Sequence, residues 1–283
     1  MTKDHSFVLG AVAYDPKVVT IWEGFRQYFA ARGFAFDFVL YTHYERQVEA
    51  HLRGDFDVAW NSPLSWLEAQ RYAVTLGRRV EAIAMRDSDR DLTSVVLVRA
   101  DGPVKSVTDL KGRIVAVGAS DSPQATLIPL EHLATQGVLA ERDFTVLRHD
   151  VMVGKHGDHV GGERDAVRAL INGDADAACV IDGNHLSFVR EGLFAQGSLQ
   201  ILTQTAPYDH CNMTVLESVP PARCARFREL LLGMSFDDPE ARPLLEMEGL
   251  RQWLDGRDTG YTQLAAAIDR FDTIAPWLAR VTG

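Results

Sequence analysis

Residues 44–65 have the sequence YERQVEAHLRGDFDVAWNSPLS, and this stretch decides the fold class. Its first part, Tyr44 to Arg53, is predicted to be a short helix, and the apolar run Phe56–Asn61 that follows is predicted to be a strand. Ser62-Pro63 then opens another helix, because proline is favoured in the first helical turn. A helix, a strand and a helix in close succession are typical of βαβ units and largely parallel sheets.

The same alternation continues in both directions. Towards the N-terminus, the predicted strands Phe7–Ala13 and Phe34–Tyr41 enclose a helix that begins at Asp15-Pro16 and stops at Gly33. Towards the C-terminus, the strand-like runs are Arg79–Met85, Ser94–Ala100, Lys111–Gly118, Phe144–His149, Ala177–Ile181, Leu199–Thr205 and Tyr208–Leu216. The helices predicted between and after them are Pro123 to about Gln136, Arg164–Ile171, and three that begin near Pro221, Ala241 and Thr259. The chain is therefore predicted to be α/β throughout.

The composition limits the classes of partner. With 283 residues, 46% hydrophobic and 24% charged, the chain is typical of ordinary globular proteins and long enough for two lobes. A net charge of -10 argues against a nucleic-acid partner, which would require a clustered basic face. No apolar run approaches the roughly 18 residues of a membrane span, so we expect no membrane insertion.

Two further expectations come from the N-terminus and from the cysteines. The N-terminus passes from a polar tail into a strand without the features of a signal peptide, which predicts a cytoplasmic protein, or a periplasmic one if a leader has been removed. Cys179, Cys211 and Cys224 are widely spaced and odd in number, so neither a disulfide framework nor a thiolate zinc site is indicated.

Several short motifs, taken in order, carry a resemblance to a known family. They are Ala13-Tyr14-Asp15-Pro16, Tyr44 to Gly54 with Asp57, Ala59-Trp60-Asn61-Ser62-Pro63-Leu64-Ser65, Ser94 to Ala100, Asp109-Leu110-Lys111-Gly112, and Asn172 to Ala178. Over nearly its whole length the chain resembles the phosphate/phosphite/phosphonate substrate-binding proteins of ABC transporters. The resemblance implies a type 2 periplasmic-binding-protein fold with two lobes, a ligand cleft between the lobes, and closure by a hinge. On this basis we expect lobe one at residues 1–95 and 206–283, and lobe two at 96–205.

Three turns after predicted strands supply the first candidate ligand-binding residues, because ligands of open α/β sheets bind beyond the carboxyl ends of the strands. Tyr14 could close over a ligand, or its turn could serve only to start a helix. Trp60, Asn61 and Ser62 offer neutral donors at a helix start, which could equally be a helix cap. The third turn contributes Ser122, Gln124 and Thr126.

The third turn departs from the family pattern. The family usually has a Ser-Thr-Ser-Gly-like run here, whose hydroxyls and amides hold an oxyanion at a helix N-terminus. In this chain Pro123 removes one amide donor and Gln124 replaces a hydroxyl, while Ser122 and Thr126 remain. A planar carboxylate or a neutral polar group is therefore as plausible a ligand as a tetrahedral oxyanion.

The fourth turn is the glycine-rich segment that follows His149. Lys155, His156 and His159 could pair with an anionic group, and Glu163 or Asp182 with an ammonium group. The same His156, His159 and Glu163 are candidate metal ligands, although His-x-x-His in a polar loop is not a closed metal signature. His210 precedes Cys211 where the chain re-enters lobe one, and it either adds a ligand or lines the cleft.

Two functions remain open at this point. The first is a substrate-binding protein for a small anionic or zwitterionic ligand, without a cofactor, that works with an ABC permease or as a ligand sensor. The second is a cytoplasmic enzyme on the same fold, with a metal in the His156/His159 loop, because a fold does not fix a function. The absence of a recognisable nucleophile–base pair favours the first.

Overall fold

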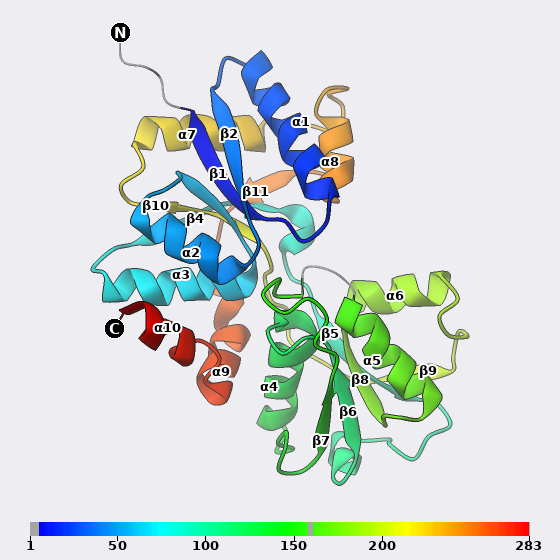
Figure 1. The fold of residues 1–283 in the computed structure, drawn as a ribbon. Helices are drawn as coiled ribbons and strands as arrows, with labels where there is room; N and C mark the ends of the chain where they lie inside the picture. The colour runs from blue at the N-terminus through cyan, green and yellow to red at the C-terminus, as the bar shows by residue number, and fades with distance from the viewer. Residues whose placement is uncertain (1–5, 158–160, 283) are drawn as a thin grey trace. The chain divides into compact units, whose positions relative to one another are not determined.

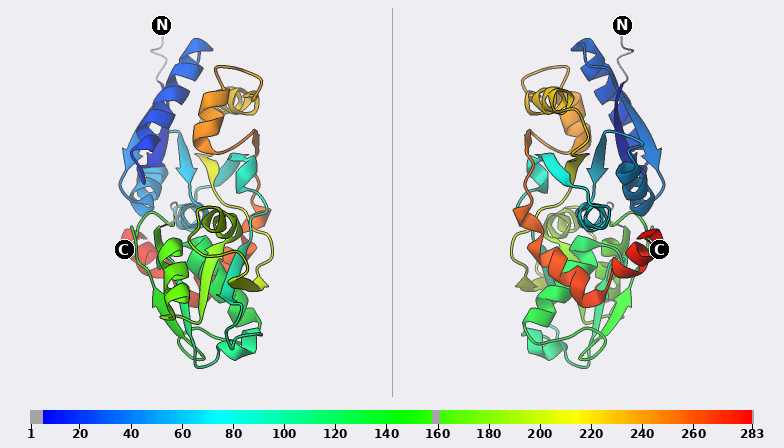
Figure 2. Two further views of the ribbon diagram at one scale, coloured as in Figure 1. Left: turned by 90° about the vertical axis from the view of Figure 1, so that its right-hand side faces the viewer. Right: turned by 90° about the vertical axis from the view of Figure 1, so that its left-hand side faces the viewer.

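The computed structural model describes residues 6–157 and 161–282, which divide into two compact units (Figure 1). Unit 1 contains residues 6–90, 209–260 and 275–282. Unit 2 contains residues 91–157, 161–208 and 261–274. Each unit is a mixed sheet with helices on both of its faces, as the two side views in Figure 2 show. The predicted α/β class is therefore correct.

Unit 1 is built on a six-stranded sheet in the order β11-β4-β10-β3-β1-β2. Its strands are β1 (Phe7–Val12), β2 (Phe36–Tyr41), β3 (Val58–Asn61), β4 (Val80–Arg86), β10 (Asn212–Leu216) and β11 (Trp253–Asp255). Its helices are α1 (Lys17–Ala31), α2 (Tyr44–Arg53), α3 (Pro63–Thr75), α7 (Pro221–Leu232), α8 (Arg242–Glu248) and α10 (Ala275–Thr282). Strand β1 is parallel to β2 and β3, whereas β10 runs antiparallel to both β3 and β4.

Aromatic side chains form the main core of unit 1. Trp22, Phe25 and Phe29 lie on one face of α1 at helical spacing and are buried against the sheet together with Phe227 of α7 and Leu245 of α8. Burying side chains of this size contributes about 1.5–3 kcal/mol each.

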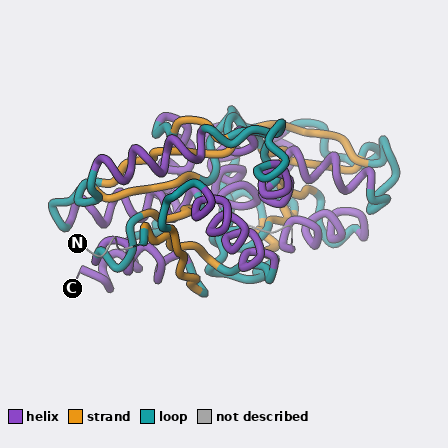
Figure 3. Tube along the Cα trace, turned by 90° about the horizontal axis from the view of Figure 1, so that it is seen from above, coloured by secondary structure: helices purple, strands orange, loops and turns teal. Residues whose placement is uncertain are grey.

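Unit 2 is built on a five-stranded sheet in the order β7-β6-β8-β5-β9. Its strands are β5 (Ser94–Arg99), β6 (Ile114–Val117), β7 (Thr145–Arg148), β8 (Ala177–Ile181) and β9 (Leu199–Gln204). Its helices are α4 (Ile128–Thr135), which follows a π-helical turn at Pro123–Leu127, α5 (Gly161–Asn172), α6 (Asp182–Arg190) and α9 (Thr262–Phe271). Helices α5 and α6 contribute to the core on one face of the sheet, and α4 and α9 to the core on the other. The alternation of helix and strand can be followed along the trace in Figure 3.

The two compact units divide the chain differently from the expected lobes. Residues 261–274 were expected in lobe one with the rest of 206–283, but they belong to unit 2. The physical reason is long-range packing: Arg270 of α9 donates to Glu131 of α4 at 3.1 Å, and Phe271 packs against the unit 2 core. Unit 2 also begins at 91 and extends to 208, because the backbones of Leu92 and Tyr208 exchange two hydrogen bonds of 2.8 Å.

Three elements were not predicted at all: α6, the short strand β11, and α10 as a helix separate from α9. No helix among the described residues is both long enough and apolar enough to cross a membrane.

Candidate functional site

The turn between β6 and α4 holds three of the predicted ligand-binding residues, Ser122, Gln124 and Thr126, which are only 2–4% exposed. Ser122 Oγ caps the helical turn by accepting a hydrogen bond from Ala125 N at 3.2 Å. Gln124 Nε2 donates to Gly157 O at 2.6 Å and so ties this turn to the loop that follows β7. Ser122 and Gln124 therefore help to build the turn itself.

Two aspartates connect the same turn to the loop after β7. Asp150 Oδ1 accepts from Ser120 N at 2.7 Å, and Asp121 Oδ2 accepts from Gly154 N at 2.5 Å and from His156 N at 3.4 Å. His156 is fully buried and has a left-handed backbone with φ of 51°, which is uncommon for a residue with a side chain. Neither aspartate is among the predicted ligand-binding residues, although both follow predicted strands.

Glu163 lies in the first turn of α5 and is 3% exposed. Its Oε2 accepts hydrogen bonds from Ile181 N and from Asn184 Nδ2, both at 2.9 Å, so the carboxylate holds the end of β8 against the start of α6. Burial, and next the charge of Glu163, raise the pKa of the Cys179 thiol to about 12. The region around Glu163 is thus acidic.

Asp182 lies close to this acidic region as the first residue of α6. Its Oδ2 accepts from Thr93 Oγ1 at 3.3 Å. Burial raises the pKa of Tyr208 well above its ordinary value, and the charges of Glu163 and Asp182 act in the same direction. The predicted pair of carboxylates therefore does share one neighbourhood in unit 2.

A narrow hollow in unit 2 brings several of these groups together. It has about 190 Å³ of atom-free space and is lined by Gly118, Ala119, Ser122, Ala125, Val151, Gly157, Gly162 and Glu163. Gly157 has φ of 72°, and a Cβ atom there would lie 2.4 Å from Ser122 Oγ. In this conformation the hollow is too tight for a water molecule.

In unit 1, Asn61 belongs to a buried hydrogen-bond network. Its Oδ1 accepts from Gln47 Nε2 at 3.0 Å and from Ser65 Oγ at 3.2 Å, and its Nδ2 donates to Thr214 Oγ1 at 2.8 Å. Ser62 caps α3 by accepting from Ser65 N at 3.1 Å. These contacts join α2, α3 and the sheet, and they give both residues a structural role.

Trp60 and Tyr14 both contact the unit 1 core. The Trp60 ring is 5% exposed and packs edge-on against Trp22 and Trp253, with ring centroids 6.5 and 5.7 Å away. Tyr14 is partly buried against the same core, and Lys17 Nζ lies 5.8 Å from its ring centroid.

His210 lies in a buried cluster of charged groups in unit 1. Its Nδ1 is 3.1 Å from Cys211 Sγ and 3.4 Å from Asp89 Oδ1. Arg86 binds both oxygens of Asp89, at 2.5 and 2.9 Å, and reaches Glu248 Oε2 at 3.0 Å. Burial opposes ionisation of Asp89, but the Arg86 and His210 contacts outweigh it and lower the pKa of Asp89 to about 2. Burial raises the pKa of Glu248 despite Arg86.

Comparison with known proteins identifies the family. The model of the family described as "ABC transporter, phosphonate, periplasmic substrate-binding protein" matches residues 10–261. The chain belongs to this family. The resemblance found in the sequence is thereby confirmed, and with it the substrate-binding function class, whereas nothing in the comparisons supports the enzyme alternative.

Solved structures confirm the fold of this phosphonate-family protein. PhnD1 from Prochlorococcus marinus, solved in complex with methylphosphonate, is 15% identical, with a TM-score of 0.68 over 94% of this chain and 98% of its own. A Xanthomonas citri protein bound to chloride ion is 17% identical, with a TM-score of 0.69 over 95% of this chain and 99% of its own. The sulphonate-binding protein SsuA from Escherichia coli is 16% identical, with a TM-score of 0.56 over 94% and 83%. These likenesses establish the two-lobed periplasmic-binding-protein fold.

The predicted metal site at His156, His159 and Glu163 stays a prediction. His159 lies outside the described part of the chain, and no group of three candidate ligands found in that part contains both His156 and Glu163. Asp89, His210 and Cys211 do place one ligand atom each within 4.8 Å of one another. A metal ion there would lie beside the Arg86 guanidinium, whose positive charge already neutralises Asp89, so this cluster fits a cation poorly.

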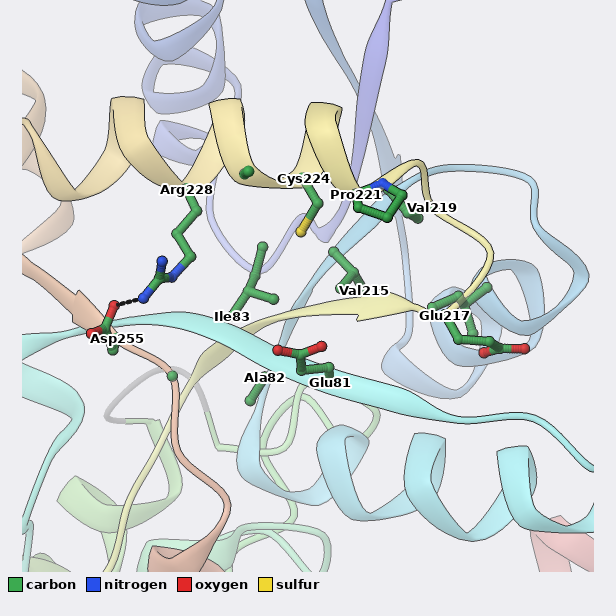
Figure 4. Close-up of a pocket in the computed structure, with 13 residues that line it drawn as sticks. Glu81, Ala82, Ile83, Val215, Glu217, Val219, Pro221, Cys224, Arg228 and Asp255 are labelled. Atoms are coloured by element: carbon green, nitrogen blue, oxygen red, sulfur yellow. Dashed lines mark hydrogen bonds and ion pairs between the residues drawn. The ribbon is translucent and has the colours of Figure 1, made fainter.

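An open cavity of about 510 Å³ lies in unit 1, apart from every predicted residue (Figure 4). Cys224 points from α7 towards Ile83 and Val215 of the sheet, and Arg228 pairs with Asp255 at one side. Burial raises the pKa of the Cys224 thiol, so it stays protonated near neutral pH. The cavity has mixed apolar and acidic walls, and its lining comes from β4, β10 and α7, which only the fold brings together.

Proposed function

We propose that this protein captures a small anionic or zwitterionic molecule and delivers it to an ABC permease. The observation that carries the proposal is the family match over residues 10–261, which covers segments of both units. The relatives give the ligand class in outline: one is described with methylphosphonate and another as a sulphonate-binding protein. We further propose a periplasmic location, following the description of the family.

We propose that the ligand contacts in unit 2 lie around the hollow lined by Ser122 and Glu163. Three features support this location: the hollow lies at the carboxyl ends of parallel strands, it contains a buried carboxylate, and a glycine permits close approach of the backbone. Gln124, Thr126, His156 and Asp182 complete the proposed set in this unit. The unit 1 residues of the predicted set contribute through the shape and rigidity of their turns, since the contacts of Asn61 and Ser62 are internal.

The proposal is tested by native mass spectrometry of purified, undialysed protein. We expect a co-purified small organic molecule, displaced on unfolding. Glu163→Gln should weaken its retention, because the hydrogen bonds of a charged group contribute about 1.5–3 kcal/mol, equivalent to roughly 10-fold to 150-fold in affinity.

Asp101→Asn is the matched control, because it removes the same charge from an exposed position of unit 2. Its ligand retention should equal that of the parent protein. Equal retention in Glu163→Gln and Asp101→Asn would remove Glu163 from the proposed site, and a protein that neither co-purifies with nor binds any small molecule would contradict the binding function.

A further inference from the structure

The turn Pro123–Leu127, which carries part of the proposed ligand site, is a π-helix rather than an α-helix. Just after it, Ile128 N donates to Pro123 O, five residues earlier in the chain. In an α-helix each amide bonds the carbonyl four residues before it, so Ile128 N would bond Gln124 O instead. Single π-helical turns are rare and often lie at functional sites. The question is what holds this turn in the π-helical register.

The hydroxyl of Ser94 occupies the carbonyl that an α-helical turn would use. Ser94 is the first residue of β5 and is 1% exposed, and its Oγ donates to Gln124 O at 2.5 Å. In the π-helical register the backbone donor to Gln124 O would be residue 129, but Pro129 has no amide hydrogen. The Ser94 hydroxyl supplies the missing donor, and it takes the acceptor that Ile128 N would need in an α-helix. Ser94 therefore favours the π-helical register.

Tyr208 orients the Ser94 hydroxyl. Its own hydroxyl oxygen is buried and lies 2.6 Å from Ser94 Oγ. Gln124 O is a carbonyl oxygen and can only accept, so the Ser94 hydrogen points to it and Tyr208 must be the donor to Ser94 Oγ. Burial raises the pKa of Tyr208, so its hydroxyl keeps the hydrogen that it donates. The two hydroxyls thus form a relay in a fixed direction, from Tyr208 through Ser94 to Gln124.

The π-helical register also leaves the hydroxyl of Thr126 available. Ser122 O accepts from Thr126 N at 3.2 Å and from Leu127 N at 3.0 Å, so both of its lone pairs are used. In an α-helical turn only Thr126 N would bond Ser122 O, and a threonine hydroxyl commonly bonds the carbonyl four residues before it. Here Thr126 Oγ1 is buried and has no hydrogen-bond partner among the described residues. Leaving a buried hydroxyl unpaired costs free energy that a hydrogen bond to a ligand would recover.

We propose that Ser94 is a positioning residue that holds this turn in the π-helical register and thereby keeps the Thr126 hydroxyl available to the bound molecule. Tyr208 supports this role by orienting the Ser94 hydroxyl. The inference rests on the proposed binding function and deepens it, because it gives a role to two residues outside the proposed set of ligand contacts. A hydroxyl both donates and accepts, so Thr126 can bond an anionic oxygen as well as an N–H group.

The first test substitutes Thr126 and compares retention of the co-purified molecule in native mass spectrometry with stability in urea, measured on protein freed of that molecule. Thr126→Val removes the hydroxyl at nearly the same volume. Retention should fall at least about fivefold, as expected for the loss of one hydrogen bond. The urea midpoint should rise, because the variant no longer buries an unpaired hydroxyl. A residue with a merely structural role would lose stability instead.

The second test substitutes the relay. Ser94→Ala should also lower retention at least about fivefold, and Tyr208→Phe should lower it less, because Ser94 can still donate to Gln124 O. The matched control is Ser198→Ala, which removes a hydroxyl that donates to a backbone carbonyl at 2.7 Å at an exposed position of unit 2. This control should leave retention unchanged.

Two further measurements show whether Ser94 acts through Thr126. The double variant Ser94→Ala with Thr126→Val should retain the molecule as well as Thr126→Val alone, since residues that act through one group are not additive. Couplings across hydrogen bonds, measured by NMR on the deuterated protein without a bound molecule, identify the acceptor of Ile128 N. This acceptor should be Pro123 O in the parent chain and Gln124 O in Ser94→Ala.

The inference would be overturned by equal retention in Thr126→Val and Ser198→Ala, or by a lower urea midpoint in Thr126→Val. An additive loss in the double variant, or an unchanged acceptor of Ile128 N in Ser94→Ala, would also overturn it. A parent chain that retains no small molecule would instead contradict the proposed function, while the acceptor of Ile128 N would still decide whether Ser94 sets the register of the turn.

Discussion

The buried imidazole of His51 should give unit 1 a measurable dependence of stability on pH. His51 is 0% exposed, and its ring stacks on Phe56 with centroids 4.9 Å apart. Burial is the main cause that lowers the pKa of His51 from 6.5 to about 4; Arg78 acts in the same direction and the backbone of Asp57 opposes them. The folded protein therefore holds this ring neutral.

The direction in which stability changes with pH follows from the difference in proton binding between the folded and unfolded chains. Between pH 6.5 and about 4, the unfolded chain binds a proton at His51 that the folded chain does not. The free energy of unfolding therefore falls as the pH falls through this window, and the full contribution is present only above pH 6.5. A lowering from 6.5 to 4, at 1.36 kcal/mol for each pH unit, corresponds to about 3 kcal/mol.

Tryptophan fluorescence during urea unfolding is the suitable assay, because all five tryptophans of the chain lie in unit 1 with His51. The substitution His51→Leu removes the titrating group at similar volume. We expect the parent protein to lose about 3 kcal/mol more than His51→Leu between pH 7 and pH 4. His43→Gln, at an exposed position just before the same helix, should retain the parent's dependence on pH.

The titration of Asp89 does not interfere with the measurement on His51. Its pKa of about 2 lies below its ordinary value of 3.8, so its contribution to stability is lost mainly as the pH falls between these two values, below the window of His51. Parallel curves for the parent and His51→Leu from pH 7 to pH 4 would refute the argument that a neutral buried ring causes the dependence.

Three further predictions concern the buried polar groups and the ligand loop. Arg86→Leu leaves its carboxylate partners buried without their cation, so it should lower the free energy of unfolding by about 3–5 kcal/mol. Arg46→Leu, at an exposed position, should lower it by less than about 1 kcal/mol. Both values are measured by urea unfolding. Asn61→Ala should cost about 1–3 kcal/mol in the same assay, because its hydrogen-bond partners stay buried. Gly157→Ala should weaken ligand retention at least about tenfold, because the added Cβ atom would clash with the turn. Gly112→Ala is the control, since Gly112 has a similar φ of 75° but faces open space, and it should not weaken retention. Equal retention in the two variants would exclude the clash as the cause.

The order of strands and helices could be predicted because it depends on local patterns. The strand Ala177–Ile181 and the helix Tyr44–Arg53 have the predicted bounds, since an apolar run and a helical repeat are both contained in a few residues. The assignment of residues 261–274 could not be predicted in the same way. It depends on long-range packing of α9 on unit 2, which includes the Arg270–Glu131 ion pair and the contact of Phe271 with the unit 2 core.

The burial of these charged groups could not be predicted either, because it depends on contacts between distant segments of the chain. Arg86, Asp89, His210 and Glu248 come from three separate segments of the chain, and nothing in their local sequence marks them as buried. The burial of His51 can be inferred from the sequence more easily, because His51 follows Tyr44 at the helical spacing i+7, on the face that α2 buries.

The role of Asp121 and Asp150 shows why a motif comparison reaches a limit at this site. The sequence shows that the turn at Ser122–Thr126 departs from the family pattern, and this alone left an oxyanion, a carboxylate and a neutral group equally open. An aspartate after a strand commonly caps a turn, so the sequence alone does not indicate that either residue bonds to another loop. Only the structure shows that each aspartate accepts from a backbone amide of the other loop, Asp150 from Ser120 N and Asp121 from Gly154 N, so that together they join the loops after β6 and β7.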